Sequence, residues 1–241
     1  MSSVPTLQNV ALLDNPIWNS LITTHAHLTL GAQIGDGLAR RYPSSIGPLS
    51  GFEKPTPEAY ADLAATVPPG DIAVLFLDDP PSHPEGWQLI RGGTLTQMIC
   101  PTLPPQPTIS EAIVPLNPTD FPEMLSLATL TEPGPFRDQT ATLGGFLGIR
   151  VDGRLAAMAG RRLAPTGFVE ISAVCTHPDF RGHGYAQALV AAVTRSIHKD
   201  GRIPFLTSFE DNTGAIRVYQ QVGFTHRRTF QLAVLKPPPT Q

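Results

Sequence analysis

The chain has 241 residues, of which 41% are hydrophobic, and its 17 lysines and arginines against 20 aspartates and glutamates give a net charge of −3. This length and composition predict a folded globular protein of one large domain or two small ones, and they exclude a disordered chain. Because an acidic chain with no run of basic residues cannot replace the counterions of a polyanion, we expect no nucleic-acid partner.

The cysteines and the N-terminus indicate the cellular compartment. Cys100 and Cys175 lie far apart in the sequence and give no disulfide framework. The N-terminus has no basic region followed by an apolar core, as a secretory leader would. We therefore expect a reducing, cytoplasmic location and no membrane partner.

The first hundred residues predict an α/β region. Asn15-Pro16 is typical of a helix start, and Gly31 is the predicted stop of that helix. A second helix is predicted over residues 58–66 and a buried strand over residues 71–77. Residues 87–100 are expected to form one strand or two.

A proline-rich stretch follows and marks the predicted domain boundary. Four prolines between residues 101 and 108 favour an extended connection. The charge also changes there, from a net of −5 in residues 1–108 to +2 in residues 109–241. We predict an N-terminal α/β region of unassigned role over residues 1–108, a second domain over 109–236 and a tail over 237–241.

The second domain begins with a predicted strand, a helix and a meander of three strands. The strand is expected over residues 112–114 and the helix from Thr119 to Thr129. Asp152-Gly153 between two apolar runs is a strong hairpin signal, because both positions of such a turn require positive φ. The strands of the meander are predicted over residues 145–151, 155–162 and 168–176.

The next segment predicts an anion-binding turn. Arg181-Gly182-His183-Gly184-Tyr185-Ala186 joins the last strand of the meander to a helix with apolar residues at spacings of three and four. Glycines let the backbone approach a ligand, and the first N–H groups of a helix attract a phosphate. Arg181-x-x-Gly184-x-Ala186 resembles the acyl-coenzyme A pyrophosphate motif of the GNAT superfamily of N-acetyltransferases.

A second signature of the same superfamily follows. A strand is predicted over residues 203–209, and then a helix capped by Asn212 and ended by Gly223. The resemblance covers roughly residues 109–236 and implies an α/β fold with a mixed sheet, the GNAT acyl-CoA N-acyltransferase fold, to which residues 1–108 add an extra region or a degenerate half copy. The second signature reads Asn212-x-x-Ala215-x-x-x-Tyr219-x-x-x-Gly223-Phe224.

Other phosphate-binding and catalytic motifs are absent from the sequence. There is no P-loop, no dinucleotide fingerprint, no nucleophile elbow, no H-E-x-x-H helix and no paired C-x-x-C. Cys175 in an apolar strand is typical of a core residue rather than a nucleophile. We expect neither hydrolase chemistry nor a metal.

The resemblance implies acetyl-CoA as cosubstrate and direct transfer of the acetyl group, within a ternary complex, to a primary amine of a small molecule or peptide. The backbone of Val174 and Thr176 would pair with the pantetheine arm. Asn212 has two open interpretations, a coenzyme contact and a helix cap. The pyrophosphate would be held through the main chain of Arg181, Gly182, His183, Gly184, Tyr185 and Ala186.

Two side chains are candidates for proton transfer. An alkyl ammonium is only about 0.04% neutral at pH 7, so the amine needs a base or desolvation. The resemblance implies Glu170 as that base, acting through water, and Tyr219 as the acid that protonates the leaving thiolate. A structural salt bridge for Glu170 and a core role for Tyr219 remain open, as does a noncatalytic acyl-CoA-binding or regulatory module.

The acceptor is less well defined by the sequence. In this fold, residues 131–137 and 225–230 would form its site, and the acidic first half is a candidate cover for the groove. Arg137 or Arg161 would suit an acceptor carboxylate, whereas Glu132 would suit a polyamine. A predicted edge strand over residues 229–235 would permit a homodimer.

Overall fold

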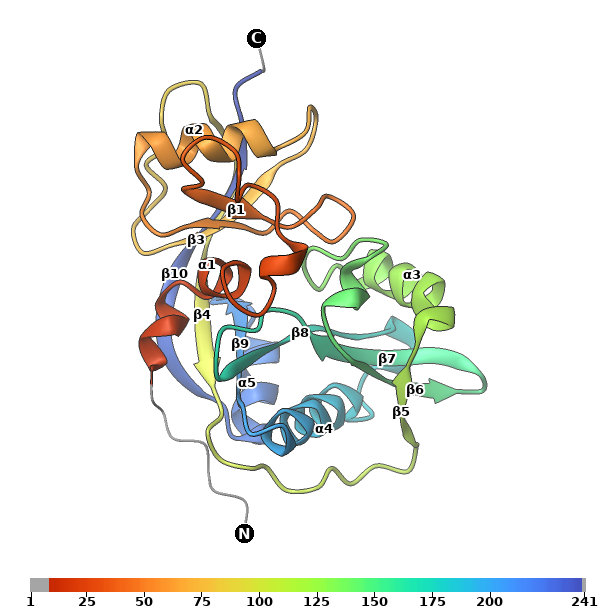
Figure 1. Ribbon diagram of the computed structural model, residues 1–241. Coiled ribbons are helices and arrows are strands. Elements are labelled where there is room, and N and C mark those ends of the chain that lie inside the picture. The colour runs from red at the N-terminus through yellow and green to blue at the C-terminus, as the bar shows by residue number, and fades with distance from the viewer. Residues whose placement is uncertain (1–8, 240–241) are drawn as a thin grey trace.

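The computed structural model describes residues 9–239 and contains one twisted sheet of eight strands (Figure 1). All neighbouring strands are antiparallel except one central pair, β8 and β9, which is parallel. The predicted mixed α/β fold is therefore confirmed. In spatial order the strands are β3 (Ala73–Leu77), β10 (Thr225–Lys236), β4 (Gln88–Ile99), β9 (Ile203–Phe209), β8 (Phe168–Thr176), β7 (Arg154–Arg161), β6 (Phe146–Val151) and β5 (Ile113–Leu116).

Within residues 9–239, five α-helices and a small hairpin complete the fold, with short 3₁₀ turns between them. The helices are α1 (Pro16–Leu21), α2 (Pro57–Thr66), α3 (Phe121–Thr131), α4 (Tyr185–Lys199) and α5 (Thr213–Val222). The second sheet pairs β1 (Ala39–Arg41) with β2 (Ser50–Phe52).

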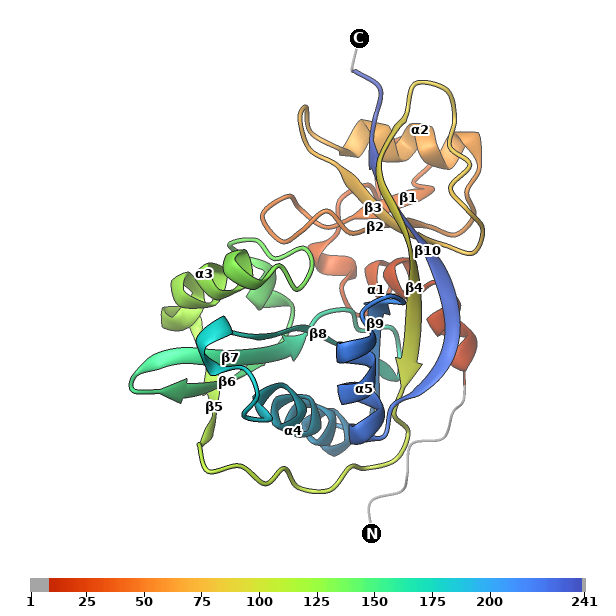
Figure 2. The same cartoon turned by 180° about the vertical axis from the view of Figure 1, so that it is seen from behind.

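The helices cover both faces of the large sheet (Figures 1 and 2). Alternate residues of β7 point to opposite faces, so Ala157 packs in the core below α4 whereas Met158 packs in the core below α3. Nearer the N-terminal half, α1 packs on the face that carries Phe168 of β8 and Phe205 of β9. Helices α4 and α5 share the opposite face, around Leu189.

Helix α1 starts where the sequence predicts and ends earlier. The Asn15 side chain accepts a hydrogen bond from the Trp18 backbone N–H, as a helix cap does. The helix stops at Leu21 because the His25 backbone N–H reaches back to the Ser20 carbonyl at 2.9 Å, and a separate 3₁₀ turn, Ala26–Leu28, follows. The prediction of one helix continuing to Gly31 is therefore wrong.

In the second half, one predicted turn is confirmed and one predicted helix start is displaced. Asp152 and Gly153 adopt φ of 49° and 79°, which confirms the predicted hairpin between β6 and β7. The segment before α3 differs in detail, since Asn117 rather than Thr119 provides the cap and a 3₁₀ turn precedes the helix.

Strand β4 connects the two predicted domains within one sheet. It belongs to residues 1–108, yet it lies between β9 and β10 and pairs with both. The predicted linker, residues 101–108, contains neither helix nor strand, and the Arg195 guanidinium of α4 donates to the Pro104 carbonyl at 2.6 Å. The boundary between two domains stays a prediction, as does the half-copy origin of the first region.

Strand β10 is not at an edge. It pairs with β4 along nearly its whole length and with β3 over Gln231 to Leu235, so most of residues 229–235 has a paired strand on both sides. The edges of the large sheet are β3 and β5. The prediction that residues 229–235 offer a free edge for dimer pairing is therefore wrong.

Among residues 9–239, no helix is both long enough and apolar enough to cross a membrane.

Candidate active site

Strands β8 and β9 separate halfway along their length. They pair at Phe168, Val169 and Glu170, and within the described chain no further pair follows toward Thr176. A β-bulge lies just beyond this point, where Ala173 has φ of 50° and the register against β7 shifts between Met158 and Gly160. The bulge bends β8 away from its parallel neighbour and opens a gap between them.

The backbone of β8 has hydrogen-bonding groups that face this gap. The N–H of His177 donates to the Ala156 carbonyl on β7 at 2.8 Å, so the backbone of residue 177 faces β7. Because successive residues of a strand alternate, the N–H and C=O groups of Val174 and Thr176 face the opposite, open side. The Thr176 hydroxyl is also buried and has no hydrogen-bond partner in the part of the chain that is described.

The glycine turn then leads into α4. Gly182 and Gly184 have φ of 84° and 77°, and a Cβ at either would meet no atom within 4 Å, so backbone conformation rather than space requires glycine. Gly184 occupies the N-cap of α4, and no described side chain caps this end. The first N–H groups of a 15-residue helix, at the positive end of its dipole, are thus available to an anion.

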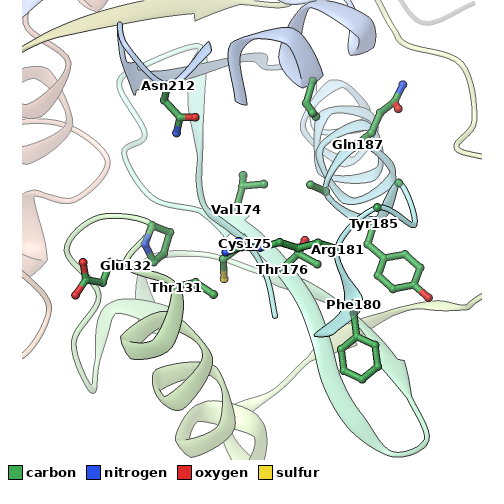
Figure 3. A pocket seen from close by; sticks show the side chains of 15 residues that line it. Thr131, Glu132, Val174, Cys175, Thr176, Phe180, Arg181, Tyr185, Gln187 and Asn212 are labelled. Carbon is green, nitrogen blue, oxygen red and sulfur yellow. The ribbon is translucent and has the colours of Figure 1, made fainter. Parts of the chain in front are cut away.

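The gap and the turn form one pocket of about 470 Å³ (Figure 3). Its wall includes every predicted coenzyme-binding residue except His183, whose exposed ring stacks on Tyr185 with Nδ1 3.0 Å from the Arg181 carbonyl oxygen. The predicted residues in the wall are Val174, Thr176, Arg181, Gly182, Gly184, Tyr185, Ala186 and Asn212.

Several residues of the wall were not predicted to bind the coenzyme. Cys175 lies between two predicted contacts, and Gln187 directly follows the glycine motif, so adjacency in sequence would have found both. Thr131, Glu132 and Pro133 come from the end of α3 and carry no motif. The sequence predicts an acceptor site for residues 131–137. In the structure, Thr131, Glu132 and Pro133 line the same pocket as the glycine turn.

Asn212 has the capping role that was one of its two interpretations. Its Oδ1 accepts a hydrogen bond from the Ala215 backbone N–H at 3.2 Å, which begins α5. The residue also lines the pocket, so the cap and a ligand contact are compatible in space.

Tyr219 lies on α5 beside the pocket rather than in its wall. Its side chain is 9% exposed and packs edge-on against Phe224, with ring centroids 6.4 Å apart. Burial raises the pKa of the phenol to about 12. The phenol therefore keeps its proton throughout the neutral range, as a proton donor requires.

Glu170 is held in an ion pair. Its fully buried carboxylate accepts hydrogen bonds from Nε and Nη2 of Arg162, at 2.7 and 3.0 Å, and from the Thr207 hydroxyl at 3.1 Å. Burial by itself lowers the pKa of Arg162, but the charge and the hydrogen bonds of Glu170, together with Tyr42, outweigh burial and raise that pKa. This geometry fits the salt-bridge interpretation, and Glu170 does not line the pocket.

Other candidate side chains are already engaged. Burial raises the pKa of the Cys175 thiol to about 11, which keeps it protonated and unreactive at neutral pH. Arg137 pairs with Asp71 at 3.0 Å, and Arg161 pairs with Asp200 at 2.6 Å, so both arginines proposed for an acceptor carboxylate have carboxylates of this chain. Within residues 9–239, no group of three or more histidine, cysteine, aspartate or glutamate side chains is placed to hold a metal ion.

Comparison with known proteins agrees with this geometry. The FR47-like protein family matches residues 146–232. A crystal structure from Novosphingobium aromaticivorans, assigned to the GNAT family of acetyltransferases, is 38% identical, covers 94% of this chain and 99% of its own, and superposes with a TM-score of 0.84. No curated protein matches. This chain belongs to the GNAT family.

More distant structures share the fold. A GCN5-related N-acetyltransferase from Kribbella flavida is 17% identical over 88% of this chain and 90% of its own, with a TM-score of 0.57. A GCN5-related N-acetyltransferase-like protein from Streptococcus suis is 15% identical over 95% and 98%, with a TM-score of 0.60. Both matches extend over the first half of this chain as well as the second. The fold of residues 9–108 is therefore shared, together with that of the second half, by these distant structures.

Proposed function

We propose that this protein is an N-acetyltransferase that moves the acetyl group of acetyl-CoA to a primary amine of a small molecule or peptide. The observation that carries the proposal is the continuous pocket that joins the open side of β8 to the glycine turn of α4. Membership of the GNAT family supports an acyl-CoA donor. The residues fit such a donor, since they offer unpaired strand groups to an amide-containing arm and helix N–H groups to a pyrophosphate.

Each part of the pocket has a distinct binding role in this proposal. The backbones of Val174 and Thr176 pair with the amides of the pantetheine arm, and the partnerless Thr176 hydroxyl gains a hydrogen bond. The N–H groups of the turn bind the pyrophosphate, and Arg181 adds a positive charge beside it. Asn212 keeps α5 in place and contacts the bound molecule.

The reaction requires two proton movements. The neutral amine attacks the thioester carbonyl carbon, a C–N bond forms, and the C–S bond then breaks with its electron pair on sulfur. Tyr219 is the candidate that donates a proton to that sulfur: burial raises its pKa to about 12, so the phenol carries its proton at neutral pH, and the same shift makes it a weaker acid than an ordinary tyrosine. The surplus proton of the nitrogen passes through water to a base, for which Glu170 remains the candidate.

Binding of the donor is the first test. Acetyl-CoA is titrated calorimetrically into the wild type, Gly184→Glu and Gly167→Glu. Gly167 is a matched control, because its φ of 83° and its open surroundings are like those of Gly184, but it lies outside the pocket. We expect binding by the wild type and Gly167→Glu and none by Gly184→Glu. Equal affinity in all three proteins, or none in the wild type, would contradict the site.

The acid is tested by Tyr219→Phe. We expect kcat to fall by about 10²- to 10⁴-fold, the usual contribution of a positioned proton donor, while the affinity for acetyl-CoA is kept. Tyr60→Phe is the control, since Tyr60 is another buried tyrosine whose hydroxyl has no described partner and which lies far from the pocket. Release of free coenzyme A with a panel of amines provides the measurement. A normal kcat in Tyr219→Phe would remove it from the mechanism.

Glu170→Gln separates the two interpretations of that residue. If Glu170 is the base, the variant loses kcat, recovers activity as the pH rises toward the pKa of the amine, and keeps its stability. If it is a structural partner of Arg162, the variant unfolds at lower urea concentration, because a buried guanidinium is left unpaired. A variant with normal activity and reduced stability would assign Glu170 to structure alone.

A noncatalytic acyl-CoA-binding module is the second candidate function. It is favoured by one observation, namely that neither Tyr219 nor Glu170 lines the pocket. Tight binding of acetyl-CoA without turnover of any amine would support this alternative, whereas turnover of any amine that Tyr219→Phe abolishes would exclude it.

A further inference from the structure

A second pocket lies on the other side of the β9–α5 turn. Its volume is about 570 Å³, and it is lined by residues 91–94 of β4 and by residues 209–212, where β9 turns into α5. Asn212 lines both this pocket and the pocket of the glycine turn. The two cavities therefore share Asn212 as a lining residue.

The strand alternation places the second pocket on the face away from α4 and α5. Phe205 of β9 and Leu95 of β4 pack in the core with α1, so Phe209 and Gly93, at even spacing from them, face the same way. Glu170 pairs with Phe205 across the parallel strands and shares this face. The second pocket thus lies on the side from which the candidate base would act.

Arg91 lies over an aromatic ring in this pocket. Its exposed guanidinium lies 4.7 Å from the centre of the Phe209 ring, a cation–π distance. Gly93 makes room for that ring, because a Cβ at this position would come within 2.9 Å of a Phe209 carbon. In the described part of the chain, Arg91 has no carboxylate partner, unlike Arg137 and Arg161.

The opposite charge comes from the turn. Glu210 is fixed by its backbone N–H, which donates to the Thr94 carbonyl at 3.0 Å, and Asp211 follows it toward Asn212. Neither carboxylate forms an ion pair with any described residue. The pocket therefore presents one guanidinium, stacked on Phe209, to an anionic group, and two carboxylates to an ammonium group, next to the residue that borders the first pocket.

We infer that the second pocket is the acceptor site and that Arg91 selects amines that carry a carboxylate. The inference rests on the proposed acetyltransferase function and names its substrate class, a small aminocarboxylate. The guanidinium of Arg91 donates two hydrogen bonds to the carboxylate, and Glu210 with Asp211 attracts the ammonium group before it loses its proton. Strand β4, and with it the first half of the chain, thereby determines specificity.

The test compares matched acceptors in the wild type and Arg91→Gln. Glycine, β-alanine, 4-aminobutyrate and lysine are each paired with the corresponding amide, and kcat/KM is obtained from the release of coenzyme A. We expect the wild type to prefer the carboxylates, and Arg91→Gln to lower their kcat/KM by about 10- to 150-fold, the range of a charge-assisted hydrogen-bonded pair. Values for the amides should stay unchanged.

Two further variants serve as controls. Arg40→Gln removes another guanidinium that lies over an aromatic ring, 5.8 Å from the centre of Trp18, outside both pockets, and should leave the preference unchanged. Arg91→Lys keeps the charge and should restore part of the loss. Equal use of carboxylates and amides by the wild type, or an unaltered preference in Arg91→Gln, would overturn the inference.

Failure of the inference and failure of the proposed function are distinguishable. If acetyl-CoA binds and neutral amines are acetylated without any dependence on Arg91, the function stands and the substrate class is wrong. If no amine is acetylated, binding of β-alanine to the coenzyme A complex is measured by saturation-transfer NMR in the wild type and Arg91→Gln. Binding that requires Arg91 would still support the pocket, and its absence would overturn it.

Discussion

The two halves of the chain are specified in different ways. In residues 109–239 the candidate coenzyme pocket follows from contiguous motifs, because the turn, the helix that follows it and the cap of the next helix are local in sequence. Residues 9–108 carry no such motif, yet they supply β4 to the middle of the sheet and one wall of the second pocket. The comparison teaches that short motifs locate the candidate coenzyme pocket, whereas the pocket proposed for the acceptor is built by strand pairing between distant parts of the sequence.

The halves are joined by a buried polar contact centred on Asp71. Its carboxylate accepts hydrogen bonds from Arg41 at 2.9 Å, from Ser44 at 2.5 Å and, across the halves, from Arg137 at 3.0 Å. Burial by itself raises the pKa of Asp71, but the hydrogen bonds from Ser44 and Arg41 lower it to about 2. The contact is therefore charged at every physiological pH.

Asp71→Asn should show the largest effect on stability. It leaves the fully buried Arg41 without a counter-charge, which costs about 3–5 kcal/mol of unfolding free energy in comparable pairs. Asp78→Asn is the control, because its carboxylate is 64% exposed beside Arg228 and a surface pair contributes about 1 kcal/mol or less. Urea unfolding measures both variants. Similar losses in the two would show that Asp71 does not hold the halves together.

His25 should make the stability of this junction depend on pH. Its Nδ1 lies 2.7 Å from the Tyr42 hydroxyl and 3.1 Å from Ser20 Oγ, which in turn accepts from the Ala164 backbone N–H of the second half at 2.9 Å. Burial, and secondarily the charges of His27 and Arg202, lowers the pKa of His25 from 6.5 to about 4.

The sign follows from proton uptake. Between pH 6.5 and 4 the side chain of His25 binds a proton in the unfolded chain but not in the folded chain. The free energy of unfolding is therefore highest above pH 6.5, and it falls by about 3 kcal/mol as the pH drops through this window. His25→Gln should flatten this slope, whereas His226→Gln, which replaces an exposed histidine, should keep it. Parallel slopes in all three proteins, measured by urea unfolding at each pH, would refute the assignment.

The smallest effects are expected from the two helix caps, one in each half. Asn15→Ala removes the cap of α1 and a second hydrogen bond, from Nδ2 to the Phe52 carbonyl at 2.8 Å, and should cost about 2 kcal/mol. Asn212→Ala removes a cap alone and should cost about 1 kcal/mol. A greater loss for Asn212→Ala in urea unfolding would reverse the expected order.

Local signals in the sequence predicted much of the second half. Asp152-Gly153 dictates its hairpin because few residues tolerate positive φ at both positions, and Asn212 with Gly223 sets the two ends of α5. These features depend on neighbours in sequence. The same signals bring the predicted glycine turn and the predicted strand residues to one pocket, although the role of each residue there stays a prediction.

The remainder depends on residues that are distant in sequence. No local pattern shows that β4 enters between β9 and β10, and this insertion is the reason that the predicted free edge over residues 229–235 is wrong. The ion pairs of Arg137 and Glu170 likewise require partners that spacing does not indicate. The contribution of Thr131 to the candidate coenzyme pocket arises from the packing of α3 against β8, which periodicity alone cannot specify.

The position of β4 also has a consequence for how the chain folds during synthesis. Among the described residues, β4 (88–99) pairs with the strands that begin at residues 203 and 225, and β3 pairs with residues 231–235. Such distant pairings close late and slow folding. Until the ribosome has released the last strand, β3 and most of β4 expose unpaired backbone to other nascent chains, so we expect the growing polypeptide to depend on chaperones until its final strand is made.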